Sequence, residues 1–93
     1  MSVQELFEKY EDEYLEFHRI ENKRSNRPDL HAFLLLDELF PSDQDIICSA
    51  EHDQFWLDVP EEEIEKIPED KIIELVRCGV GYDEDIESLS MFA

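Results

Sequence analysis

Negative charge is the feature of this sequence that most limits what the chain can fold into and bind. Asp and Glu number 26 against 8 Lys and Arg, so the formal net charge is -18 over 93 residues. Chains with this much charge of one sign often stay disordered, because they bury too little apolar surface to offset the entropy lost on folding. Here 42% of the residues are hydrophobic and 11% aromatic, against only two glycines. We therefore expect one compact, ordered domain over residues 1–93.

The same charge limits the kinds of partner. DNA, RNA or an anionic membrane would meet a surface of its own sign, so we expect none of them to bind directly. A basic protein, above all one that binds nucleic acid, is the expected partner, and a homodimer stays open as an alternative. The longest apolar run, residues 32–36, is far too short for a membrane span, and no signal-peptide pattern opens the chain. These observations predict a cytoplasmic protein.

Hydrophobic spacing predicts two helices in the first 40 residues. Ser2 and Glu5 form a capping box, and apolar residues then recur at spacings of three and four, which predicts one helix over residues 3–21. Pro28 fits the first turn of a second helix over residues 28–40, whose many leucines predict that it is largely buried. The apolar residues of the first stripe are Val3, Leu6, Phe7, Tyr10, Tyr14 and Phe17.

The rest of the chain predicts two β-hairpins with helices between them. Short runs rich in Ile, Phe, Trp and Val indicate strands, and prolines and a glycine mark where helices begin and end. The fold class is therefore α+β, a small antiparallel sheet of two hairpins packed against helices in the order ααββααββ. The expected elements are strands at 45–50 and 54–59, helical turns over 61–67, a helix from Pro68 to Gly79, and strands at 80–82 and 88–92.

Catalytic, metal and cofactor motifs are weak. Cys48 and Cys78 fit buried apolar positions without a disulfide, and they lack the paired Cys-x-x-Cys spacing of a zinc site. The acids of residues 83–87 alternate as in a calcium loop but lack the glycine and the distal glutamate of an EF-hand. No glycine-rich phosphate loop or nucleophile elbow is present. We expect no catalytic residue, metal or cofactor, and hence a protein that is not an enzyme.

Basic residues gather in one short island. Residues 17–31 carry a net charge of +2, whereas residues 1–16 carry -5 and residues 32–93 carry -15. The island could grip an acidic partner or a phosphate, but ion pairing with nearby carboxylates inside the fold is the favoured interpretation. Its members are Arg19, Lys23, Arg24 and Arg27.

Two adjacent aromatic residues in the second predicted strand point to opposite faces of the sheet. Because side chains alternate along a strand, Phe55 and Trp56 cannot both face the same layer. Helices could cover both faces. Alternatively, one ring is left exposed and contributes to a partner or homodimer surface, where aromatic residues are enriched.

The leading hypothesis is a non-enzymatic inhibitor that mimics nucleic acid in the basic groove of its partner. Duplex DNA carries one charge per about 1.7 Å of axis, so eighteen charges correspond to roughly 30 Å of duplex, about the diameter of a compact domain of this length. In size and acidity the chain resembles the small DNA-mimic inhibitors that phages use against host defence nucleases. The expected partner-binding residues are Glu5, Glu8, Asp12, Glu16, Glu61, Glu62, Glu65, Asp83, Glu84, Asp85 and Trp56.

Two other hypotheses remain open. An immunity protein or antitoxin would neutralise one basic toxin, with acids that speed the encounter and anchors such as Tyr10, Tyr14 or Trp56 that carry the affinity. The chain resembles nuclease-immunity proteins in size and charge. Alternatively, the charge only keeps a small domain soluble. Under every hypothesis, added salt should raise the melting temperature, since it screens repulsion between like charges.

Overall fold

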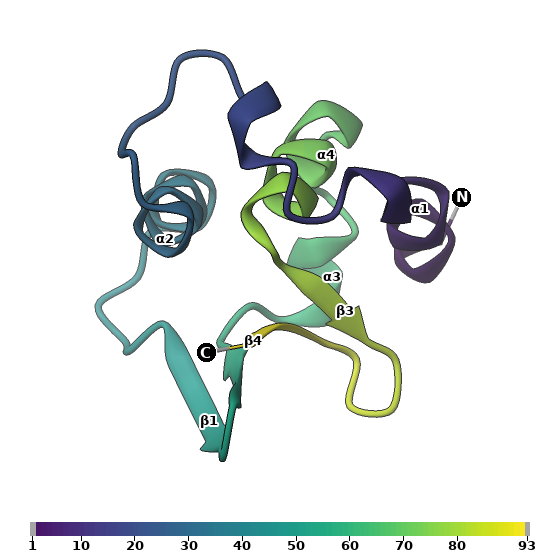
Figure 1. The fold of residues 1–93 in the computed structure, drawn as a ribbon. Helices are drawn as coiled ribbons and strands as arrows, with labels where there is room; N and C mark the ends of the chain where they lie inside the picture. The colour runs from purple at the N-terminus through teal and green to yellow at the C-terminus, as the bar shows by residue number, and fades with distance from the viewer. Residues whose placement is uncertain (1, 93) are drawn as a thin grey trace.

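A four-stranded antiparallel sheet joins two hairpins that lie far apart in the sequence (Figure 1). In the computed structural model, which describes residues 2–92, strands β1 (Ile47–Glu51) and β2 (Gln54–Leu57) form the first hairpin. Strands β3 (Gly81–Asp83) and β4 (Ser88–Phe92) form the second. The hairpins pair through β2 and β4, so the strand order is β1-β2-β4-β3. The predicted α+β class, with two hairpins packed against helices, is confirmed.

Helices lie above one end of the sheet in Figure 1, with α1 beside α4 and β3. The principal extents are 28 × 28 × 27 Å and the Cα radius of gyration is 12.1 Å, close to the size expected for the length. Within residues 2–92, no helix is long and apolar enough to cross a membrane. The helices are α1 (Val3–Lys9), α2 (Pro28–Leu39), α3 (Glu61–Ile64) and α4 (Glu69–Cys78), with 3-10 turns η1 (Glu11–Glu13) and η2 (Phe17–Arg19).

The core lies where α2 and α4 meet one face of the sheet. Leu35 of α2, Leu75 of α4 and Leu57 of β2 are completely buried. Each such side chain contributes about 1.5–3 kcal/mol on leaving water. The ring of Phe33 meets that of Phe55 edge-on at 6.1 Å between centroids, so α2 covers the inner face of β2. The outer face of the sheet carries Trp56, Ser90 and Phe92 and forms one side of the candidate site.

The predicted first helix over residues 3–21 is wrong beyond Lys9. The capping box forms, but the chain leaves helical geometry and Leu15 adopts a left-handed conformation with φ 65°. Its amide donates to the carbonyl oxygen of Val76 at 3.2 Å, which pins the segment to the last turn of α4. Continuing the helix would also bring Glu8, Glu11 and Asp12 together at spacings of three and four, where like charges repel one another.

The predicted stop of α4 at Gly79 is confirmed, and it requires glycine. Gly79 has φ 98°, which side chains with a Cβ rarely adopt. Its amide donates to the Val76 carbonyl at 2.9 Å, and the amide of Val80 donates to the Leu75 carbonyl at 3.0 Å. This turn directs the chain straight into β3, at the edge of the candidate site.

Two burial predictions fail. Helix α2 is only half buried, because Leu30 and Leu34 face solvent with 43% and 39% of their surface exposed. Cys48 was expected in the core but is exposed, since β1 is an edge strand and every residue of it is exposed. Cys78 is buried as predicted, and burial raises the pKa of its thiol to about 12.

Candidate partner-binding surface

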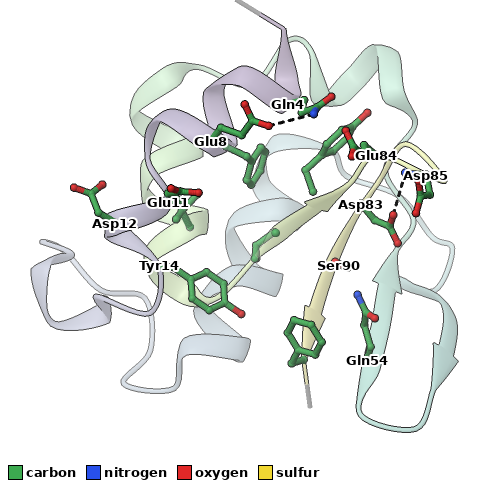
Figure 2. Close-up of a pocket in the computed structure, with 16 residues that line it drawn as sticks. Gln4, Glu8, Glu11, Asp12, Tyr14, Gln54, Asp83, Glu84, Asp85 and Ser90 are labelled. Carbon is green, nitrogen blue, oxygen red and sulfur yellow. Dashed lines mark hydrogen bonds between the residues drawn. The ribbon is translucent and has the colours of Figure 1, made fainter.

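A groove of about 920 Å³ separates the α1–η1 segment from the outer face of the sheet (Figure 2). Both walls carry carboxylates, and aromatic and aliphatic side chains line the space between them. We call it the acidic groove. Its lining carboxylates are Glu8, Glu11 and Asp12 on one wall and Asp83, Glu84 and Asp85 on the other.

A smaller hollow of about 200 Å³ continues the acidic groove toward α3. Gln4, Tyr82 and Glu84 line both hollows, so the two adjoin. The second adds carboxylates from α3 and from the β3–β4 turn. We call the combined set of carboxylates the acidic band: Glu8, Glu11, Asp12, Glu61, Glu65, Asp83, Glu84, Asp85 and Glu87.

The acidic band is not neutralised from within the fold. Neither hollow is lined by a Lys, Arg or His side chain, and within residues 2–92 no carboxylate of the band forms an ion pair. Hydrogen bonding with Glu87, followed by partial burial and nearby negative charge, raises the pKa of Glu61. Burial first, and then the charges of Glu61 and Glu87, raise the pKa of Tyr82. Neighbouring carboxylates contribute to both shifts, so the potential around Glu61 and Tyr82 is negative.

Other carboxylates are matched by cations. Glu13 accepts from Nε of Arg77 and from Nη1 of Arg19, each at 2.9 Å. Arg77 first, and then Arg19, lower the pKa of Glu13 despite partial burial of its carboxyl. Arg24 pairs with Glu38. The favoured interpretation of the basic island, pairing inside the fold, therefore holds for Arg19 and Arg24.

Seven of the predicted partner-binding residues come together on the acidic band, and three predicted carboxylates do not. Glu5 caps the start of α1 with Ser2, and Glu16 lies 3.4 Å from Nε2 of His18. Glu62 is exposed on α3 but lines neither hollow. The seven on the band are Glu8, Asp12, Glu61, Glu65, Asp83, Glu84 and Asp85.

Trp56 lies on the outer face of the sheet, beside the acidic groove but not in its lining. Its indole N–H donates to Oδ2 of Asp83 at 3.0 Å across β4, so the ring is half buried and its polar atom is already used. Phe55 points to the opposite face, as predicted, and is covered by Phe33. Trp56 therefore orients a carboxylate of the groove and is not a freely exposed anchor.

Several residues of the site were missed from the sequence. Glu11 lies in η1, after α1 has ended, so helical spacing from Glu8 does not account for its place in the groove. Glu87 reaches the smaller hollow from a turn in which it has φ 52°, and Phe92 reaches the groove through the register of β4 with β2. Neither a turn conformation nor a strand register can be read from acidic spacing.

Comparisons give no independent assignment, since no protein-family model, curated protein or solved structure matches this chain. Within residues 2–92, no group of three or more His, Cys, Asp or Glu side chains is arranged to hold a metal ion. The chemistry of the acidic groove and band is therefore the basis for assigning a function.

Proposed function

We propose that the protein binds a basic protein through the acidic band and occupies the surface that this partner uses for nucleic acid. One observation carries the proposal: nine carboxylates from α1–η1, α3 and the β3–β4 turn line two adjoining hollows, and among residues 2–92 no cationic side chain lines either hollow. The proposed role is one of binding and includes no catalytic step.

The charge of the whole molecule is comparable to that of duplex DNA of the same length. The molecule is 28 Å long, and duplex DNA of that length carries roughly 16 phosphates, close in number to the net charge of -18 of the chain. The band gathers nine of the carboxylates around two adjoining hollows. A basic surface shaped for phosphates would therefore meet a comparable density of negative charge.

The energetic state of the band also favours a basic partner. Carboxylates gathered without a lining cation repel one another, so a partner that supplies cations relieves repulsion present in the free protein. Long-range attraction between surfaces of opposite sign also speeds the encounter, and salt weakens it. The proposal therefore predicts affinity that falls steeply as salt is added.

Displacement of DNA tests this proposal. A fluorescent DNA duplex is bound to a basic protein that contacts DNA without sequence preference, and the acidic protein is titrated in at about 0.1 M salt, where the Debye length is about 10 Å. We expect release of the duplex, followed as a fall in fluorescence anisotropy, and weaker release as salt rises. Failure to displace DNA from any of a panel of such proteins at low salt would contradict the proposal.

A pair of charge-matched variants locates the effect. The band variant carries Glu8→Gln, Asp12→Asn, Glu84→Gln and Asp85→Asn, and it spares Asp83 because that carboxylate accepts from Trp56. Displacement should weaken at least 10-fold in the band variant and about 2-fold or less in a control with the same net charge, because only charges within a Debye length of the partner act strongly. Equal losses of displacement in the two variants would show that displacement depends on net charge and not on where the charges lie. The control carries Asp43→Asn, Asp45→Asn, Glu51→Gln and Asp53→Asn, all exposed and outside the band.

The exposed rings of the acidic groove favour a second candidate, neutralisation of one basic toxin. Tyr14 and Phe92 line the groove with 38% and 63% of their surface exposed, and such aromatic side chains act as anchors in specific protein complexes. A toxin-specific protein would bind one partner tightly even in high salt, whereas a nucleic-acid mimic would bind several basic proteins and release them as salt rises. Affinities measured across salt therefore separate the two.

A further inference from the structure

We propose that the acidic groove receives arginine side chains of the basic partner, in preference to lysine. This inference rests on the proposed function and adds to it: the band attracts a basic surface, and the groove selects which cations of that surface enter. It is drawn from the apolar, aromatic lining between two walls of carboxylates.

The lining offers aromatic faces to a flat cation. Tyr14 and Phe92 are exposed at the groove, and Tyr82 stacks on Phe7 with 6.0 Å between ring centroids and 25° between ring planes. A guanidinium is planar and weakly hydrated, so it stacks on such rings at little cost. An ammonium is a compact, strongly hydrated ion and loses more hydration when it enters an apolar groove.

The walls offer carboxylates that are free to accept. Within residues 2–92, the side-chain oxygens of Glu11 on one wall and of Glu84 and Asp85 on the other accept no hydrogen bond. Asp12 also accepts none, but its carboxylate points away from the opposite wall in Figure 2. Asp83 differs, because its two oxygens accept from the Trp56 indole and the Asp85 amide. A guanidinium held against a ring can still donate in its plane to such carboxylates, often in pairs of parallel bonds.

The size of the groove points to more than one arginine. Its volume of about 920 Å³ lies near the upper end of ligand pockets, which span roughly 300–1,000 Å³. Successive turns of a basic helix or neighbouring positions of a strand would place several arginines in it together. Because both walls are acidic, we expect the groove to bind an arginine-rich segment of the partner.

Two peptides of equal length and charge test this inference. One alternates arginine with alanine, the other alternates lysine with alanine, and the affinity of each is measured by calorimetry in about 0.1 M salt. We expect the arginine peptide to bind about 10-fold more tightly, since two rings each add a stacking contribution that lysine does not match. Proteins with a uniform acidic coat would bind the two peptides alike.

Substitution of the rings shows where the preference arises. The variant Tyr14→Leu with Phe92→Leu keeps apolar surface and every charge but removes both exposed rings. The arginine preference should fall to about 2-fold or less, with lysine-peptide affinity unchanged. The control Leu30→Ala with Ile47→Ala alters exposed apolar residues outside the groove and should keep the full preference.

The outcomes separate this inference from the proposed function. Equal, salt-sensitive binding of both peptides would overturn the arginine preference and leave the proposed function standing. A preference that survives in the Leu variant would overturn its assignment to the groove. Absence of binding to either peptide at low salt would overturn the inference and the proposed function together.

Discussion

Glu13 and Glu61 show that the same side chain serves two opposite purposes in this molecule. Glu13 is held between Arg19 and Arg77, which lower its pKa, whereas Glu61 faces Glu87, which raises its pKa. The first carboxylate is stabilised as an anion by the fold, and the second is crowded by other anions. Arg19 and Arg77 therefore pair with a carboxylate that links two parts of the chain, whereas among residues 2–92 no cationic side chain lines the hollows of the acidic band.

The ion pairs of Glu13 with Arg19 and Arg77 hold the chain between α1 and α2 against α4. Glu13 joins this segment to Arg77 of α4, 64 positions away, and the amide of Leu15 donates to Val76 beside it. A hollow of about 600 Å³ nearby is lined by cations and carboxylates together, unlike the acidic groove. The following substitutions break one region while sparing the other.

The largest effect is expected at Gly79, whose left-handed turn lies against Leu15 in the segment between α1 and α2. Gly79→Ala forces a side chain into a left-handed conformation with φ 98° and puts its Cβ 2.9 Å from Cδ2 of Leu15. Rotation of the exposed Leu15 side chain relieves the contact but not the backbone strain, so we expect a loss of about 1–2 kcal/mol in the free energy of unfolding. Urea denaturation measures it.

Gly81→Ala is the matched control for that substitution. A Cβ at Gly81 meets no atom within 4 Å, and this glycine has no positive φ, so its change should stay within about 0.5 kcal/mol. Equal losses at both glycines would show that the left-handed backbone of Gly79 is not the source of the loss.

The next effect is a loss of stability in Glu13→Gln. The amide cannot neutralise Arg19 and Arg77, so we expect the largest fall in melting temperature among single carboxylate substitutions. Because the pKa of Glu13 is lowered, its stabilisation is present above the ordinary value of 4.5 and is lost as pH falls through the lower folded value. Wild type should therefore lose stability below pH 4.5 more steeply than this variant does.

Glu61→Gln should have a smaller effect of opposite sign. Its pKa is raised, so the ionised carboxyl destabilises the fold at neutral pH and the penalty fades as pH falls toward 4.5. The variant should melt above wild type at pH 7 and match it near pH 4. Glu51→Gln, on the exposed edge strand β1, is the control and should change little at either pH. A lower melting temperature for Glu61→Gln at pH 7 would remove the contrast with Glu13.

The smallest effect is the response to salt. Sodium chloride should raise the melting temperature of wild type, because it screens repulsion along the acidic band, and should raise that of the four-substitution band variant less. A wild-type melting temperature that does not change between 0.05 and 0.5 M salt, about a threefold range of Debye length, would show that the band carries little repulsion.

The sequence predicted the local elements better than the contacts between them. Prolines, Gly79 and alternating apolar residues placed α2, α4 and both hairpins near their observed bounds. The break after Lys9 was missed because the stripe of apolar residues carries no sign of the bond from Arg77 to Glu13. Burial of Cys48 was wrongly expected because composition does not show which strand lies at the edge.

The candidate site follows the same pattern. Spacing along a helix predicted Glu8 and Asp12, and local clustering predicted residues 83–85. Their meeting in one groove depends on β4 pairing with both β2 and β3, which brings Phe92 and Asp83 to the same outer face. No local signal predicts that pairing.

Mapping by nuclear magnetic resonance tests the central claim most directly. The 15N-labelled protein is titrated with the arginine–alanine peptide at about 0.1 M salt, and amide shifts are followed along the chain. We predict that the changes concentrate in α1–η1, α3 and the β3–β4 turn, which carry the acidic band. Changes spread evenly over all acidic positions, including Asp43 and Glu51, or centred on α2 and β1, would contradict it.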